Sequence, residues 1–415
     1  MTRWPLTPRG TGAVLLGLAS LVLAPTFSIP ALVFVGVLLL AAVALSFASL
    51  WLGHRADGIQ RSFAPAVAAV GGDVDVRVRV DSRSVLPTVL GTWQDRLPRG
   101  VEGEPSGVYP ALRSGLVAGS HRVDLAYRVQ ARRRGVRPIG PLVVETTDPF
   151  GLTRRLQQLG DTVPLTIAPA LMSLEGLDDL PGAAGGTMQS TTDKLGQGAD
   201  NLIPRVYAPG DSMRRIHWRA SAHRGELMVR QEERESNPEA VVVFDRSVAR
   251  WSGDALRSPG EDPDFEAAVS TVVSAVARFV GEGYSVAVID VDGSELVESI
   301  EGGDVAAVEA MATGFATLTA RRDGALTELA PLFAGSTLGP VVVVTGEVYP
   351  VDAASLAPIV GHSSMPVLFA LAGAGDALRV ARESGWRVHR LEPEDELRDL
   401  WSGAGGGDGV RGHAR

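Results

Sequence analysis

The densest group of chemically versatile side chains lies between Tyr207 and Ala222, where the chain reads YAPGDSMRRIHWRASA. This short segment combines an aromatic ring, a Pro-Gly turn, a carboxylate, guanidinium groups, an imidazole and an indole. Arginine, tryptophan and tyrosine are the residue types enriched at protein–protein hot spots. The composition therefore predicts either a clasp that holds two parts of the protein together or a contact surface for a partner.

Local patterns predict how this segment folds. The Pro-Gly pair at 209–210 predicts a turn, and Asp211 follows in the position of a helix N-cap. Met213, Ile216 and Ala220 have the spacing of one apolar stripe on a short helix. We single out these signature and interaction residues: Tyr207, Gly210, Asp211, Arg214, Ile216, His217, Trp218, Ser221 and Ala222.

None of these side chains predicts catalysis. On the expected helix, Ser212 and His217 stand five residues apart and would point about 140° away from each other, so they do not form a nucleophile–base pair. We interpret His217 as a packed histidine, Trp218 as a packing anchor, and Asp211 as a cap paired with an arginine. The chain also shows no phosphate-binding loop, nucleophile elbow or His-Glu-x-x-His motif. We therefore expect a protein that is not an enzyme and name no catalytic residue; an envelope-biogenesis hydrolase is the least favoured hypothesis.

A second candidate site follows the buried strand that ends at Asp245. Ligands of doubly wound sheets bind beyond the carboxyl ends of the strands. Asp245 and Ser247 there resemble the metal-ion-dependent adhesion site of von Willebrand factor A domains, in which carboxylate and hydroxyl oxygens hold Mg²⁺. The pattern is degenerate, because Ala249 stands at the second serine position and Thr345 at a later acid position. We prefer a metal-free domain with Asp245 paired to an arginine, and keep a Mg²⁺-dependent binding or sensing module as the alternative.

The N-terminal region has the composition of a membrane anchor. No charged residue occurs between 10 and 53, and one span needs about 20 apolar residues. The prolines at 25 and 30 would break the run into two transmembrane helices, at about 10–28 and 31–52. A cleaved signal peptide is the less favoured interpretation. Basic residues flank both outer ends, so the positive-inside rule puts both termini in the cytoplasm of a multi-pass protein of the bacterial inner membrane; these residues are Arg3, Arg9, His54, Arg55 and Arg61.

Residues 59–170 have the pattern of a β-rich domain. Val74–Val80 alternates strictly between apolar and polar residues, as a half-buried strand does. Short strands around Gly/Pro turns follow at Gly135–Glu145, and Asp148–Leu152 predicts a turn before another strand. These patterns predict a β-sandwich or barrel. We interpret Arg132–Arg134 as a solvated hairpin tip, or alternatively as a group that contacts a membrane surface.

The pattern changes after a Gly- and Ser-rich linker at 171–202 and the signature segment at 203–236. Between 237 and 401, apolar strands alternate with amphipathic helices, which predicts a doubly wound α/β domain with a parallel sheet. Residues 402–415 read as a disordered tail. The expected strands are 240–245, 284–290, 340–345, 366–370 and 386–391, and the expected helices are 265–280, 305–318 and 376–383.

Composition excludes several classes of function. The formal net charge of −9 argues against general nucleic-acid binding, because no basic excess is present to neutralise phosphates. The chain contains no cysteine, which excludes thiolate catalysis, disulfide bonds and cysteine-ligated zinc.

Taken together, these motifs resemble the bacterial domain of unknown function 58 family. The resemblance implies a membrane-anchored protein with a von Willebrand factor A-like C-terminal domain, whose gene neighbours encode MoxR-type AAA+ ATPases. It further implies an adaptor whose partners are the membrane and such an ATPase, and it brings no catalytic residues; the acidic charge argues against nucleic acid as a partner. The motif is Arg205-Val-Tyr207-x-Pro-Gly-Asp211-x-x-Arg214-x-Ile216-His217-Trp218-x-x-Ser221-Ala222, accompanied by Arg133–Gly135 and Asp148–Leu152.

Overall fold

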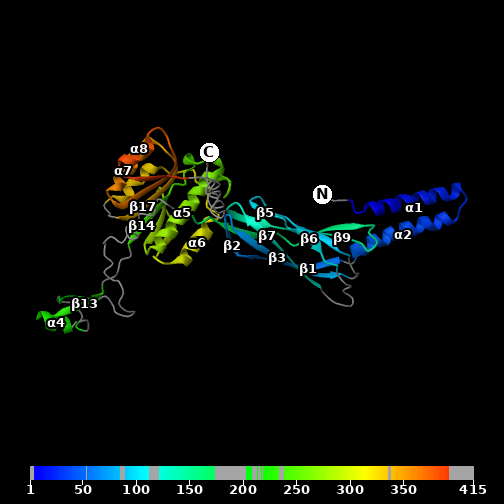
Figure 1. The fold of residues 1–415 in the computed structure, drawn as a ribbon, viewed down its shortest axis with the longest axis horizontal. Coiled ribbons are helices and arrows are strands. Elements are labelled where there is room, and N and C mark those ends of the chain that lie inside the picture. Colours follow the sequence, from blue (N-terminus) through cyan, green and yellow to red (C-terminus); the bar gives the residue numbers. More distant parts are fainter. Residues whose placement is uncertain are drawn as a thin grey trace, which may run out of the picture.

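The computed structural model describes most of the chain as three successive parts, a helical hairpin, a β-rich domain and an α/β domain (Figure 1). The expected linker and tail lie outside the described residues, except for Leu171, Met172 and Leu202. Four signature residues, Gly210, Asp211, Arg214 and His217, also lie outside them. The described residues are 4–52, 54–84, 89–111, 121–172, 202–207, 213, 216, 218–232, 238–334 and 338–391.

Two antiparallel helices form the N-terminal hairpin: α1 (Pro8–Thr26) and α2 (Ala31–Leu52). They lie close to the expected ranges, because the prolines fall at helix starts and in the last turn of α1, where the chain reverses. The helices approach closely at their glycines, since a Cβ on Gly36 would lie 2.9 Å from the carbonyl oxygen of Gly17. Both helices are long and apolar enough to span a membrane, by length and composition.

The β-rich domain begins at His54, before the expected boundary at residue 59, and its last strand ends at Ala168. The sheet orders are β1-β3-β7-β5, β10-β9-β4-β6 and β2-β11-β8. The expected strand pair around residue 140 is therefore divided, with β8 and β9 in different sheets. The strands are β1 (His54–Ala64), β2 (Val67–Ala69), β3 (Asp73–Ser84), β4 (Gly91–Asp95), β5 (Val101–Gly103), β6 (Ser106–Tyr109), β7 (His121–Ala131), β8 (Gly135–Ile139), β9 (Leu142–Thr147), β10 (Arg154–Leu159) and β11 (Val163–Ala168).

One apolar core joins the three sheets. The alternating valines of β3, from Val74 to Val80, all point inward, while the arginines and aspartates between them are exposed or half-buried. They pack in the same cluster as Trp93 of β4, Leu142 of β9 and Ile167 of β11. Side chains of facing sheets thus share one interior, as in a sandwich.

The α/β domain contains a six-stranded sheet with the order β16-β15-β14-β17-β18-β19. All neighbouring strands are parallel except β16, which runs antiparallel at one edge. The expectation of a doubly wound α/β arrangement is confirmed. The elements are β14 (Glu239–Phe244), η3 (Val248–Arg250), η4 (Gly253–Leu256), α5 (Pro263–Gly281), β15 (Ser285–Asp290), β16 (Glu295–Ile300), α6 (Val305–Phe315), η5 (Leu326–Glu328), η6 (Ala330–Phe333), β17 (Leu338–Val348), α7 (Pro350–Val360), β18 (Ser363–Gly373), α8 (Ala377–Glu383) and β19 (Arg387–Arg390).

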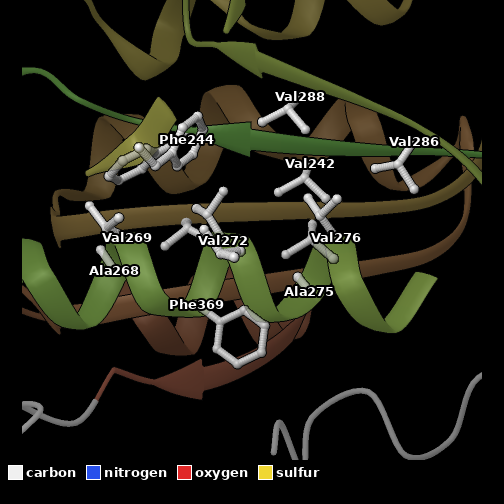
Figure 2. Close-up of a cluster of buried hydrophobic side chains, with 14 of the residues drawn as sticks. Val242, Phe244, Ala268, Val269, Val272, Ala275, Val276, Val286, Val288 and Phe369 are labelled. Carbon is white, nitrogen blue, oxygen red and sulfur yellow. The ribbon is translucent and has the colours of Figure 1, made fainter. Parts of the chain in front are cut away.

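Both faces of this sheet are buried, and successive residues of one strand serve opposite faces. Val242 and Phe244 pack against α5, in the cluster drawn in Figure 2. Val241 and Val243 point to the other face, where they join Leu356 of α7 in a separate cluster. This division explains why the strand is continuously apolar in sequence.

Two elements of this domain were not predicted. The edge strand β16 has the sequence ELVESI and is mostly exposed or half-buried, so it lacks the apolar run of its neighbours. Helix α7 begins at Pro350 and contains Pro358, a residue that usually marks a helix boundary. Helix α6 also ends at Phe315, three residues before the expected end at Leu318.

The interpretation of Arg132–Arg134 as a solvated hairpin tip was wrong for Arg134, because this turn between β7 and β8 meets the α/β domain. Arg134 is 1% exposed, whereas Arg133 pairs with Glu261 at the edge of the contact. The Arg134 guanidinium donates to both carboxylate oxygens of Glu266 on α5, at 2.7 Å from Nη2 to Oε1. The same group donates to the carbonyl oxygen of Phe315, the last residue of α6, and to that of Leu318, three residues later. A cation is favoured there, because the last turn of a helix carries partial negative charge.

Candidate functional site

The signature segment forms a small unit of its own, consisting of the antiparallel pair β12 (Leu202–Val206) and β13 (Met228–Glu232) and the helix α4 (Trp218–Arg224). Tyr207 N donates to Leu227 O at 2.7 Å, which extends the pairing beyond the strands. Ser221 Oγ accepts from Met228 N at 2.8 Å and thereby ties α4 to β13. Gly225 follows the last residue of the helix; its φ of +74° is a conformation that glycine adopts without strain.

The expected apolar stripe on a helix was wrong. Ile216 lies before the helix begins at Trp218 and forms an antiparallel bridge with Val229. Ile216 is buried there at 6% exposed. Burial of its side chain against the hairpin outweighs the weak helix preference of a segment this short.

The interpretation of Trp218 as a packing anchor was also wrong. Its side chain is 69% exposed, and that of Met213 is 66% exposed. Val206 and Leu227 at the hairpin end are exposed as well, and so is Ala222, while Tyr207 is half-buried. The structure therefore presents aromatic and aliphatic side chains to the surroundings from one small unit. Whether Asp211 caps a helix or pairs with an arginine falls outside the described residues.

Asp245 lies at the carboxyl end of β14, where the sequence places it, and is fully buried. Ser247 N donates to its Oδ1 at 3.0 Å, and Thr345 Oγ1 donates to its Oδ2 at 2.8 Å. Arg250 Nε lies 3.7 Å from the same Oδ2. The structure thus brings together the residues Asp245, Ser247 and Thr345, and it identifies Arg250 as the arginine that was expected to pair with Asp245.

The arginines at this edge of the sheet are paired with other acids as well. Arg250 makes a two-point pair with Asp352 of α7, at 2.6 and 2.8 Å. Arg246 donates to Asp290 at 2.8 Å, and Arg321 Nε lies 3.2 Å from the same oxygen. The carboxyl edge of the sheet is therefore a network of alternating charges.

This network does not fit a resident Mg²⁺ as it stands. Within the described parts of the chain, no group of three or more His, Cys, Asp or Glu side chains is placed to hold a metal ion. Mg²⁺ requires near-octahedral oxygen ligation, but the Asp245 oxygens already accept from protein donors and face a guanidinium. One observation points the other way, because the buried Ser247 Oγ makes no hydrogen bond of ordinary geometry among the described residues, although it is close enough to the Asp245 carboxylate to help lower the pKa of that group.

Burial and hydrogen bonding act in opposite directions on the acids of this edge. Burial is the largest influence on Asp245 and raises its pKa above the usual value, against hydrogen bonds from Ser247 N and Thr345 and the charge of Arg250. At Asp292, hydrogen bonds from Arg321 and Ser294 hold the pKa well below its usual range. The buried Asp245 carboxylate is thus stabilised by hydrogen bonds from the protein and by the charge of Arg250 rather than by water.

Comparison with known proteins supports the family resemblance for part of the chain. Residues 204–313 match the sequence profile of the family described as "Protein of unknown function DUF58". This range contains the signature segment from Pro204 onward and the strands and helices up to α6. The family description assigns no activity.

Other comparisons add no functional assignment. No curated protein matches the chain. Among solved structures, the chain is similar to a Pseudomonas fluorescens alkylpurine DNA glycosylase, AlkC, bound to DNA containing an abasic site analogue, at 15% identity. That similarity covers 32% of this chain and 38% of the glycosylase, with a TM-score of 0.16. A similarity of this size supports no conclusion about fold or function.

Proposed function

We propose that this protein is a membrane-anchored adaptor that binds other proteins and acts with a MoxR-type AAA+ ATPase in the assembly or maturation of envelope or other complexes. The observation that supports binding most directly is the exposure of Trp218 and Met213 on the signature segment. Aromatic residues and methionine are enriched at protein interfaces, and exposed groups of them commonly mark interaction sites. The choice of partner rests on the family resemblance.

The geometry supports binding rather than catalysis. At the carboxyl edge of the α/β sheet, Asp245 and Asp290 are occupied by hydrogen bonds and arginine pairs. We therefore assign the signature segment to partner recognition and the α/β domain to its support.

Membrane anchoring is supported by the arrangement of the hairpin. The start of α1 and the end of α2 both lie at the β-rich domain (Figure 1). Both large domains would then lie on one side of the membrane. Arg9, Arg154 and Arg155 belong to that end, so the positive-inside rule assigns this side, and both termini, to the cytoplasm. A topology reporter fused after Arg415 should be active in the cytoplasm; activity only outside it would exclude a cytoplasmic ATPase partner.

The partner proposal is tested by purification from membranes in detergent, followed by mass spectrometry. We compare the wild type with Trp218→Ala and Met213→Ala. Val351→Ala on α7 is the matched control, because this side chain is similarly exposed, at 64%, but lies in the α/β domain and not in the signature segment. A MoxR-type ATPase should accompany the wild type and the control and be reduced with the two signature variants. The proposal fails if no such ATPase is enriched, or if both variants with unchanged melting temperature retain it.

The Mg²⁺-dependent module is the second candidate function. The buried Ser247 hydroxyl beside Asp245, which makes no hydrogen bond of ordinary geometry among the described residues, favours it, whereas the nearby Arg250 counts against it. A gain in melting temperature with Mg²⁺ that Asp245→Asn abolishes would support the metal-dependent module.

A further inference from the structure

The turn Asp148–Leu152 and the first residues of β10 hold both outer ends of the helical hairpin. Thr7 N donates to Leu152 O at 3.0 Å, and Thr7 Oγ1 donates to Gly151 O at 2.6 Å. Leu6 forms a bridge with Thr153, and Arg154 N donates to Pro5 O at 2.8 Å. The segment before α1 therefore pairs with the chain that follows the turn.

The end of α2 is fixed at the same place. Arg155 Nη1 donates to the carbonyl oxygen of Leu50 at 2.7 Å, and its guanidinium lies 5.0 Å from the ring centre of Trp51. The last carbonyl groups of a helix lack partners within the helix, so Arg155 satisfies one of them. Both helices are therefore attached to the β-rich domain at one place, formed by the turn Asp148–Leu152 and the first residues of β10, which we call the platform.

The platform exposes large aromatic side chains. Trp4 is 66%, Trp51 53% and Phe150 65% exposed. Each belongs to the segment that precedes α1, ends α2 or forms the connecting turn, so all three surround the base of the hairpin. Tryptophan is enriched at the level of lipid headgroups, where an apolar ring with a polar N–H is favoured.

Basic side chains accompany these rings. Arg9 is exposed in the first turn of α1, and Arg154 and Arg155 are half-buried beside Trp4 and Trp51. Glu145 lies 3.6 Å from Arg154, and Asp148 is a buried carboxylate in the connecting turn, so these two acids offset part of the charge of the three arginines. A local positive excess on a protein with a net charge of −9 is placed where anionic headgroups would lie.

We propose that Trp4, Trp51 and Phe150, together with Arg9, Arg154 and Arg155, form a headgroup-binding surface that seats the β-rich domain on a phospholipid bilayer and prefers anionic lipids. We assign this surface to lipid headgroups because it adjoins the apolar helices that would span the membrane. The inference rests on the membrane anchor of the proposed function. It assigns to this platform the lipid contact that the sequence suggested for Arg132–Arg134.

The test uses single cysteines, since the chain contains none of its own. Full-length Trp4→Cys and Phe150→Cys are spin-labelled in vesicles of phosphatidylcholine with phosphatidylglycerol, and accessibility to oxygen and to a water-soluble nickel chelate is measured. Val22→Cys in α1 reports the hydrocarbon, and Val351→Cys on α7 reports water; both positions are exposed in the structure, at 68% and 64%. Labels at residues 4 and 150 should report a depth between these two references.

The outcomes separate the two proposals. If the label at residue 22 reports lipid but those at 4 and 150 match residue 351, the headgroup surface is overturned and the anchor stands. If residue 22 also reports water, the membrane anchor fails and the inference fails with it.

Lipid preference is measured by native mass spectrometry of the detergent-released protein. Arg9→Gln, alone and combined with Arg154→Gln and Arg155→Gln, should retain less phosphatidylglycerol relative to phosphatidylcholine than the wild type. Because Arg9 is exposed, whereas Arg154 and Arg155 contact the ends of the hairpin, a loss seen with Arg9→Gln alone indicates headgroup binding rather than loosening of the platform. Arg257→Gln is the control, because its side chain is 78% exposed but lies in the α/β domain. Equal retention by the wild type and the triple variant would overturn the preference for anionic lipids.

Discussion

Arg134 of the β-rich domain and Glu266 of the α/β domain form an ion pair that is enclosed on both sides, with side-chain exposures of 1% and 7%. Gly260 N donates to the same carboxylate at 3.0 Å, and Arg137 donates to Pro259 O at 2.7 Å. The domains therefore meet through several directed polar contacts around one buried guanidinium. This arrangement couples the orientation of the α/β domain to that of the β-rich domain.

Removal of one partner of this pair should destabilise the protein strongly. Arg134→Ala leaves the Glu266 carboxylate without its main donor in a buried site, and loss of one partner of a buried ion pair costs about 3–5 kcal/mol. The free energy of unfolding in detergent, followed by tryptophan fluorescence, measures the loss. Arg132→Ala is the control, because Arg132 and Glu102 form a largely exposed pair, and such pairs contribute about 0–1 kcal/mol. Equal effects of the two variants would contradict this account.

Gly10 is required because α1 passes directly over the turn Asp148–Leu152. A methyl group at this position would overlap the carbonyl oxygen of Leu152, whereas a methyl group on Gly12 would meet nothing within 4 Å. Gly10→Ala should therefore displace the turn and lower stability by about 1–3 kcal/mol, the usual cost of overpacking. Gly12→Ala should be neutral or raise stability by up to about 1 kcal/mol, because alanine favours helix. Melting temperatures in detergent test the pair, and a stable Gly10→Ala protein would disprove the close contact.

Asp148 should make stability depend on acid. Burial raises its pKa, but hydrogen bonds from Thr153 and Phe150 outweigh burial and leave the pKa below the usual value of 3.8. Its stabilisation is therefore present above pH 3.8 and is lost as the pH falls through the folded-state pKa. Asp148→Asn, which presents an amide nitrogen to these donors, should cost about 1–3 kcal/mol at neutral pH. The difference from wild type should shrink below pH 3.8.

A matched control accompanies this measurement. Asp124→Asn removes an exposed carboxylate that pairs with Arg79, so it should change stability little at any pH. A difference between wild type and Asp148→Asn that stays constant as the pH falls would show that the carboxylate charge is not what stabilises the turn.

The sequence predicted those elements in which the local order of apolar and polar residues shows which side chains are buried. The apolar run at 240–244 implied a strand covered on both faces, and Val242 and Val243 do serve opposite faces of the sheet. The lack of charge between 10 and 53 likewise located the two long apolar helices.

The prediction failed where an outcome depends on distant residues. Nothing local to Arg134 indicates that α5 and α6 supply its partners, because these residues lie more than 130 positions away in the chain. Similarly, Trp218 is exposed because Ile216, rather than the tryptophan, occupies the buried place beside Val229. At Asp245 the pattern located the carboxylate, but the position of Arg250 beside it followed from α7 and its Asp352.

Magnesium should not stabilise this protein, because the Asp245 carboxylate already faces Arg250 and accepts two hydrogen bonds. A ligand that binds only the folded state must raise stability, so the melting temperature with Mg²⁺ or Mn²⁺ should equal that with a chelator. Arg250→Gln removes the guanidinium charge and is the informative variant. If the wild type gains stability from the metal and Asp245→Asn does not, Asp245 and Ser247 form a metal site and the metal-free account is wrong. If only Arg250→Gln gains stability from the metal, the arginine is what excludes the ion from the site.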